Sequence, residues 1–190
     1  LADGSASDRA LQAFTLDLPR QPDADRAIEA AEHHLLGPVA ESTLSAQPLD
    51  RSSLLQGLDA SQVDTVRAVM TEIRLYAGEI LFRQGDAAEG LYVLSLGSVS
   101  VIGRNGSSTH RFLSISPGMM LGETAMLDGG GRTADAVADT FTVLHHLSQR
   151  DLQALQRDQP ALASRLHANI AVHLSTRLRA ASAAWWASQL

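Results

Sequence analysis

The sequence predicts a mainly β protein with flanking helices, organised as a jelly roll of seven or eight short strands. Residues 72–147 hold seven short apolar runs of β type, which are separated by turns that contain glycine. Asn105-Gly106 lies between two of these runs, and this dipeptide is the strongest short hairpin signal. After Leu147 the apolar residues recur at helical spacing. Many short strands at this spacing favour a sandwich or jelly roll over a parallel α/β sheet.

The composition fits one folded domain with a short appendage. The chain has 190 residues, of which 45% are hydrophobic and 19% charged. The net charge is −6 and the sequence has no basic block, so we expect no nucleic-acid binding. The absence of cysteine excludes disulfides, thiolate metal sites and a cysteine nucleophile, and fits a reducing compartment. No long apolar run or leader segment is found, so we expect a cytoplasmic location without membrane insertion of this chain.

Residues 1–50 differ in character from the rest and are expected to form a helical segment and a linker. Residues 23–36 are rich in Ala, Glu and Arg, and their apolar positions lie on one face of a helix. Pro22 precedes this helix and Gly37-Pro38 follows it. The polar stretch over residues 41–53 is interpreted as the linker.

The strands and helices after the linker are expected in the following order. A short helix spans Ser61–Met70, with Ser61 as its N-cap. The expected strands are Glu72–Tyr76, Ile80–Arg83, Leu91–Leu96, Val99–Gly103, His110–Ile115, Ala134–Ala138 and Thr142–Leu147.

Two helices are expected at the C-terminal end. The first has Ser148 as its N-cap and ends near Pro160. Pro160 then stands in the first turn of a second helix, which is expected to reach Ala181. In this second helix an apolar residue recurs every four positions, at Leu162, Leu166, Ile170, Leu174 and Leu178. Residues 182–190 are expected to form a tail.

Two blocks that contain glycine hold the residues that could form a functional site. In the first block, residues 78–99, the glycines are interpreted as turns with positive φ, at Gly78, Gly85, Gly90 and Gly97. The second block runs from Gly122-Glu123-Thr124-Ala125 through three glycines to Arg132-Thr133.

The second block predicts an anion site. Residues 122–125 can open one helical turn whose first N–H groups have no partner within the helix. Arg132 can fold back over the same place and hold an anion through two parallel N–H bonds. Glu123 beside an anion is understandable if its carboxylate accepts hydrogen bonds from a neighbouring sugar hydroxyl. Together these groups describe a site for a phosphorylated ribose.

Simpler interpretations of the same residues stay open at this point. Arg132 can be a surface residue in a glycine loop, and Glu123 can be an acid favoured by the dipole at the start of a helix. Thr133 can be a strand residue rather than a ligand contact. Trp185 and Trp186 can cap a ligand, contact a partner, or form an apolar end of the chain.

Both blocks resemble the cyclic-nucleotide-binding domain. This is the family of bacterial catabolite-activator proteins, protein kinase A regulatory subunits and cyclic-nucleotide-gated channels. Residues 122–125 followed by Arg132, nine residues after Glu123, are similar to the family's phosphate-binding cassette. The resemblance covers residues 54–181 and implies an eight-stranded jelly roll. Gly131 departs from the family, in which many members have proline before the arginine, and a looser loop is expected there.

The resemblance also implies a role for each cassette residue. It implies that Arg132 binds the cyclic phosphate and that Glu123 binds the ribose 2′-hydroxyl. The backbone N–H groups of residues 122–125 are implied to hold the remaining phosphate oxygens. The ligand-binding residues expected on this basis are Gly122, Glu123, Thr124, Ala125, Arg132 and Thr133.

The implied function is a non-catalytic regulatory module that binds cAMP or cGMP, without a cofactor. Thr133 does not decide between the two bases. The helix over residues 160–181 is expected to act as a lid over the site, or to form the seam of a homodimer. The alternative function is a nucleotide-free protein-interaction or dimerisation domain with the same fold.

Enzyme and metal functions are not favoured. The pairs His33-His34 and His145-His146 are adjacent, so the two rings of each pair point apart and cannot chelate one metal. The sequence lacks the His-x-His pattern with a following Glu that is expected of a metal-binding cupin. It also has no Gly-x-Ser-x-Gly elbow. Because only nine residues follow Ala181, we expect no DNA-reading helix-turn-helix unless the sequence is a truncation.

The N-terminal segment carries a second resemblance. Residues 23–36 resemble the last helix of a STAS domain, as found in SulP-type sulfate and anion permeases. In some bacterial permeases of that group and in certain glutaminases, a cyclic-nucleotide-binding domain follows the STAS domain. The resemblance implies a fusion to a membrane transporter, with this chain on the cytoplasmic side.

Overall fold

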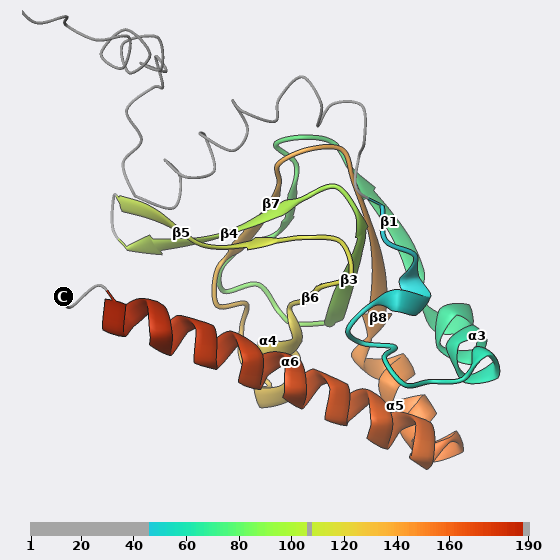
Figure 1. Ribbon diagram of the computed structural model, residues 1–190. Helices are drawn as coiled ribbons and strands as arrows, with labels where there is room; N and C mark the ends of the chain where they lie inside the picture. Colours follow the sequence, from blue (N-terminus) through green and yellow to red (C-terminus); the bar gives the residue numbers. More distant parts are fainter. Residues whose placement is uncertain (1–45, 106–107, 188–190) are drawn as a thin grey trace, which may run out of the picture. The chain divides into compact units, whose positions relative to one another are not determined.

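The computed structural model describes residues 46–105 and 108–187 (Figure 1). These residues belong to the compact unit Ser45–Leu190. The predicted helix over residues 23–36 and the STAS resemblance fall outside the described residues and stay predictions.

Two antiparallel four-stranded sheets form the body of the domain, in the orders β1-β8-β3-β6 and β2-β7-β4-β5. This arrangement confirms the mainly β, jelly-roll prediction. The strands are β1 (Thr71–Leu75), β2 (Ile80–Phe82), β3 (Gly90–Leu96), β4 (Val99–Asn105), β5 (Ser108–Ile115), β6 (Met120–Leu121), β7 (Asp135–Ala138) and β8 (Thr142–Ser148).

Seven of these strands match the predicted runs within two residues at either end. The predicted hairpin is confirmed, because β4 pairs with β5 as far as Asn105 and Ser108. The strand that the sequence did not reveal is β6. Its two residues, Met120 and Leu121, pair with Val93 and Tyr92 of β3. A strand of two residues is too short to show alternation of apolar and polar positions.

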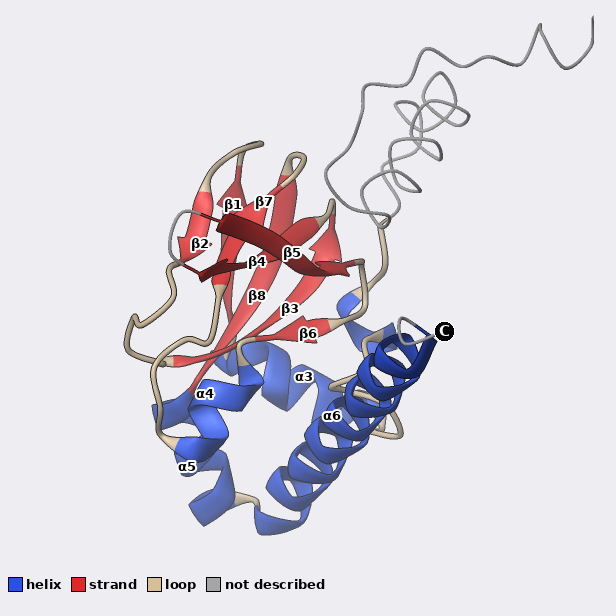
Figure 2. Ribbon diagram, turned by 90° about the vertical axis from the view of Figure 1, so that its left-hand side faces the viewer, coloured by secondary structure: helices blue, strands red, loops and turns tan. Residues whose placement is uncertain are grey.

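The helices of the described chain lie at one end of the two sheets (Figure 2). They are the short 3-10 helix η1 (Leu49–Arg51) and the α-helices α3 (Ala60–Val69), α4 (Glu123–Asp128), α5 (Gln149–Asp158) and α6 (Pro160–Ala187). Ser148 caps α5 as predicted, since its hydroxyl accepts from the backbone N–H of Asp151 at 3.0 Å.

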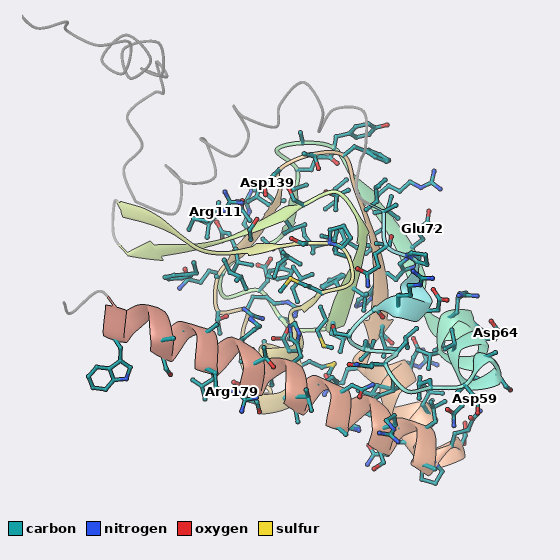
Figure 3. All side chains as sticks on the ribbon, in the orientation of Figure 1. Asp59, Asp64, Glu72, Arg111, Asp139 and Arg179 are labelled. Atoms are coloured by element: carbon teal, nitrogen blue, oxygen red, sulfur yellow. The ribbon has the colours of Figure 1, made fainter. Side chains whose placement is uncertain are left out.

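The predicted N-cap of α3 is wrong by two residues. Asp59 is the cap rather than Ser61, and its carboxylate accepts from the backbone N–H of Gln62 at 2.9 Å. The Gln62 side chain in turn accepts from the backbone N–H of Asp59. This reciprocal capping box satisfies two backbone donors at the start of the helix. Asp59 is labelled in Figure 3 at the start of the helix.

Strand β3 is buried on both of its faces and separates two apolar cores. Leu91 and Val93 pack with the helices, in the core that also holds Leu166 of α6. Tyr92 and Leu94 point between the two sheets, where a second core lies. Tyr92 thereby carries its ring into the space between the sheets, where it meets the guanidinium of Arg132.

Helix α6 is longer than predicted and leaves part of its apolar stripe uncovered. It continues past Ala181 to Ala187. Leu166 and Ile170 are fully buried, whereas Leu178 is 69% exposed. A step of four residues overshoots a turn of 3.6 residues by about 40°, so the stripe winds around the helix. The later residues of the stripe therefore turn away from the domain.

Candidate functional site

The N-cap of α4 is a glycine in the left-handed conformation. Gly122 follows β6 directly and has φ +81°, with no side-chain cap on the helix. A Cβ atom at this position would lie 2.6 Å from Nη1 of Arg132, so a larger residue would displace the guanidinium. Glycine is therefore required both by the backbone conformation and by the approach of Arg132.

Arg132 is a buried residue, and the interpretation as a surface arginine is wrong. Its exposure is only 3%. Nη1 donates to the carbonyl of Gly122 at 2.7 Å, and Nη2 donates to the carbonyl of Gly90 at 2.9 Å. The guanidinium carbon lies 4.5 Å from the centre of the Phe82 ring and 5.4 Å from that of Tyr92. The Nε atom is buried and has no hydrogen-bond partner among the described residues.

The main chain of Arg132 is fixed to the turn between β2 and β3. Its N–H donates to the carbonyl of Asp86 at 2.9 Å, and its carbonyl accepts from the N–H of Gly85 at 2.8 Å. Gly131 pairs with Ala87 in an isolated bridge. These bonds hold the residue in place although three glycines precede it.

Glu123 is fully buried and forms an ion pair with helix α6. Its Oε1 accepts from Nη1 of Arg177 at 2.7 Å. Its Oε2 is also buried and has no partner among the described residues. An acid favoured only by a helix dipole has no need of burial. An unpartnered carboxylate oxygen in the interior is costly, and such groups commonly mark a functional site.

A cavity of about 40 Å³ lies between α4, Arg132 and α6. Five of the six expected ligand-binding residues line it, and Glu123 lies between two of them with its carboxylate turned toward Arg177. The lining residues are Phe82, Val101, Gly122, Thr124, Ala125, Arg132, Thr133, Ala134 and Arg177.

Known proteins are similar to this chain in sequence and in fold. A family model described as the cyclic nucleotide-binding domain matches residues 72–159. The chain is 36% identical over 132 residues to the cyclic AMP receptor protein of Thermus thermophilus, covering 68% of this chain and 59% of the relative. The crystal structure of the N-terminal domain of a transcriptional regulator from Streptomyces coelicolor A3(2) superposes with a TM-score of 0.61. That structure is 32% identical, and the match covers 68% of this chain and 93% of that one.

The chain contains a cyclic nucleotide-binding domain. Glutaminase 2 of Bradyrhizobium diazoefficiens also matches, with 33% identity over 162 residues, covering 84% of this chain and 25% of the relative. The chain thus spans between a quarter and three fifths of these two curated relatives. The 162-residue match is longer than the segment Ser45–Leu190, so it includes part of the N-terminal segment of this chain.

Sequence reasoning missed several residues around the cyclic nucleotide-binding domain's cassette. Arg177 stands off the apolar stripe of α6, but nothing in its spacing indicates a contact with Glu123. Gly90 was expected as a turn with positive φ, and this is wrong. It is a strand residue, and it is needed because a Cβ there would lie 2.2 Å from the carbonyl oxygen of Leu147. The other three glycines of the first block do have positive φ, at Gly78, Gly85 and Gly97.

One histidine of α6 lies beside the ion pair of the cassette. His173 is buried, and its Nε2 lies 3.1 Å from the carbonyl of Met120. Burial lowers the pKa of His173 below its ordinary value, Glu123 raises it and Arg177 lowers it. Helix α6 therefore reaches the cassette through two side chains, His173 and Arg177.

Residues 46–105 and 108–187 contain neither a metal-binding cluster nor a membrane-spanning helix. No group of three or more His, Cys, Asp or Glu side chains in this part of the chain is placed to hold a metal ion. No helix in this part is long and apolar enough to cross a membrane.

Proposed function

We propose that this domain is a regulatory module that binds a cyclic nucleotide, cAMP or cGMP, without catalysis and without a cofactor. The ligand-binding residues are Gly122, Glu123, Thr124, Ala125, Arg132 and Thr133. Two buried polar atoms carry the proposal, because each lacks a partner in the described structure: Nε of Arg132 and Oε2 of Glu123. Both belong to residues that adjoin Gly122. One is a donor suited to a phosphate oxygen and the other an acceptor suited to a hydroxyl.

The size of the cavity indicates that ligand binding involves helix α6. A volume of about 40 Å³ is far below the roughly 300–1,000 Å³ of ordinary ligand pockets. Arg177 is the lining residue contributed by α6, and it occupies one oxygen of Glu123. A ligand hydroxyl that bonds to Glu123 competes with Arg177 for this carboxylate. The ligand then favours a state in which this part of α6 lies further from α4, to the extent that it binds that state more tightly.

Calorimetry with both cyclic nucleotides tests the proposal. Loss of a buried arginine–phosphate contact costs about 3–5 kcal/mol. Arg132→Ala is therefore expected to weaken binding by at least about a hundredfold, at about 1.4 kcal/mol per tenfold. Arg179→Ala is the matched control, because Arg179 is an exposed arginine of α6 (Figure 3). Circular dichroism establishes that both variants are folded. Equal affinity of the wild type and Arg132→Ala would remove Arg132 from the site.

A second candidate function is self-association through α6. Val172, Leu178 and Trp186 are 61%, 69% and 66% exposed on this helix. Exposed large apolar side chains along one helix are a feature of protein interfaces. Sedimentation at increasing protein concentration tests a homodimer, with Leu178→Arg as the disrupting variant. A protein that stays monomeric at all concentrations, while binding nucleotide, contradicts this candidate.

The whole-protein context is also a proposal. The match to the glutaminase extends into the N-terminal segment. We infer from this that the domain follows another domain in a larger cytoplasmic or membrane-attached protein. A fusion to an anion transporter rests on the STAS resemblance of residues 23–36. Transport or glutaminase assays on the full-length protein, with and without cyclic nucleotide, distinguish these outputs.

A further inference from the structure

An aromatic wall stands behind Arg132 in the space between the two sheets. It consists of Phe82, Tyr92 and His146, which come from β2, β3 and β8. The rings of Phe82 and Tyr92 are 5.8 Å apart, and Tyr92 stacks on His146 at 4.7 Å with an interplanar angle of 26°. The Arg132 guanidinium lies against the first two rings. His146 is thus joined to the cassette arginine through one tyrosine.

Gly90 provides a second connection between the same two residues. Its carbonyl accepts from Nη2 of Arg132 at 2.9 Å. A Cβ added to Gly90 would lie 2.6 Å from Nε2 of His146, so the imidazole packs closely over this glycine. Nε2 of His146 is buried and has no hydrogen-bond partner among the described residues. The ring is therefore held by packing and stacking, and one of its nitrogens is unsatisfied.

The charged residues around His146 come from three separate parts of the chain. Arg132 precedes β7, Glu89 precedes β3, and Asp151 lies in α5. Burial lowers the pKa of His146 below its ordinary value and Arg132 lowers it further, whereas Glu89 and Asp151 raise it. The neutral imidazole is therefore favoured as long as no anion is bound to Arg132.

We propose that His146 is a positioning residue for Arg132 and couples ligand binding to pH, so that an anion bound at Arg132 draws a proton from solvent onto the imidazole. This inference rests on the proposed cyclic nucleotide function. The phosphate charge offsets that of Arg132 and removes one of the two causes that disfavour the imidazolium. Affinity then increases as the pH falls through the interval between the His146 pKa of the complex and that of the free domain. It levels off below the lower of the two values.

The test is calorimetry with cAMP and with cGMP from about pH 5 to about pH 8, where histidine titrates. Buffers of different ionisation enthalpy count the protons taken up. The wild type is expected to bind several-fold more tightly at the acidic end, at most about tenfold for each unit of difference between the two pKa values. It is also expected to take up a fraction of a proton.

Three variants isolate the residue. His146→Gln is expected to lose the proton uptake and the His146 share of the pH dependence. His146→Phe keeps an aromatic ring against Tyr92 and is expected to lose them as well, which separates the titrating imidazole from the stack. His145→Gln is the matched control, because adjacent residues of a strand point to opposite faces and His145 faces Glu72 and Arg67 instead. It is expected to behave as the wild type.

A second measurement does not depend on ligand. Imidazole resonances followed by NMR are expected to show a higher His146 pKa in Arg132→Gln than in the wild type. Proton uptake that persists in His146→Gln, or a His146 pKa that ignores Arg132, overturns this inference and leaves the proposed function standing. Absence of nucleotide binding at every pH overturns the proposed function, and this inference with it.

Discussion

Arg177 of α6 donates to Glu123 of α4 at 2.7 Å, and this ion pair joins two residues that lie 54 positions apart in the sequence. Glu123 is fully buried, while the Arg177 side chain keeps 30% of its surface exposed. The pair connects the cassette directly to the longest helix of the domain. Under the proposed function, occupation of Glu123 by a ligand is expected to be linked through this pair to movement of that helix.

The Glu123–Arg177 pair is expected to stabilise the ligand-free domain. Arg177→Gln leaves the Glu123 carboxylate buried with weaker partners, so the free energy of unfolding should fall by about 1–3 kcal/mol. Urea unfolding of Arg177→Gln, Glu123→Gln and the double variant measures the coupling. Additive losses in this cycle would show that the two side chains do not interact.

Because β3 and β8 approach closely at Gly90, we expect this position not to tolerate a side chain. Gly90→Ala would place Cβ 2.2 Å from the Leu147 carbonyl oxygen and 2.8 Å from Cα of Ser148, which are both main-chain atoms. The two strands must then separate, and we expect a loss of at least about 1–3 kcal/mol in urea unfolding. Gly130→Ala is the control, because its nearest neighbour is the movable Asp128 side chain at 3.0 Å. A loss no larger than that of the control would contradict the packing described here.

Substitutions at two positions of the apolar stripe of α6 are expected to change the free energy of unfolding by unequal amounts. Ile170→Ala removes a fully buried side chain and is expected to cost about 2–5 kcal/mol of unfolding free energy. Leu178→Ala changes a residue that is 69% exposed and is expected to stay within about 0.5 kcal/mol of the wild type. Urea unfolding at low protein concentration, where self-association is absent, measures both. Equal losses would place the two residues in the same environment.

The stability of the domain is expected to decrease on acidification. Burial lowers the pKa of His145, His146 and His173 in the folded state. The unfolded chain consequently binds more protons below about pH 6.5, and the free energy of unfolding falls as the pH decreases through this region. Unfolding measured from about pH 5 to about pH 8 checks this, and His173→Gln should reduce the slope. A slope unchanged in that variant would mean that His173 does not contribute.

Most of the fold could be predicted because the strands are short apolar runs and glycine turns separate them. Gly78, Gly85 and Gly97 have the positive φ that such turns need. The limits of this reasoning show at β6, which is too short to have a pattern, and at Asp59, whose capping depends on the Gln62 side chain. Both depend on partners that composition and period do not specify.

Only those residues of the candidate site that lie close together in the sequence could be predicted. Gly122, Glu123 and Arg132 lie within eleven residues, and a helical turn followed by a glycine loop brings them together. The contacts of Arg177, His173 and His146 with this group come from other elements of the fold. They depend on how helices and strands pack, and spacing along the chain does not reveal such packing.

The main-chain bonds of Arg132 have a consequence for how this family member can vary. The residue is fixed on its far side, by Gly85 and Asp86, rather than by the glycines that precede it. Insertions or deletions between Leu127 and Gly130 should therefore leave the guanidinium where it is. A change of length in the opposite turn, between β2 and β3, should instead displace the guanidinium from Gly122.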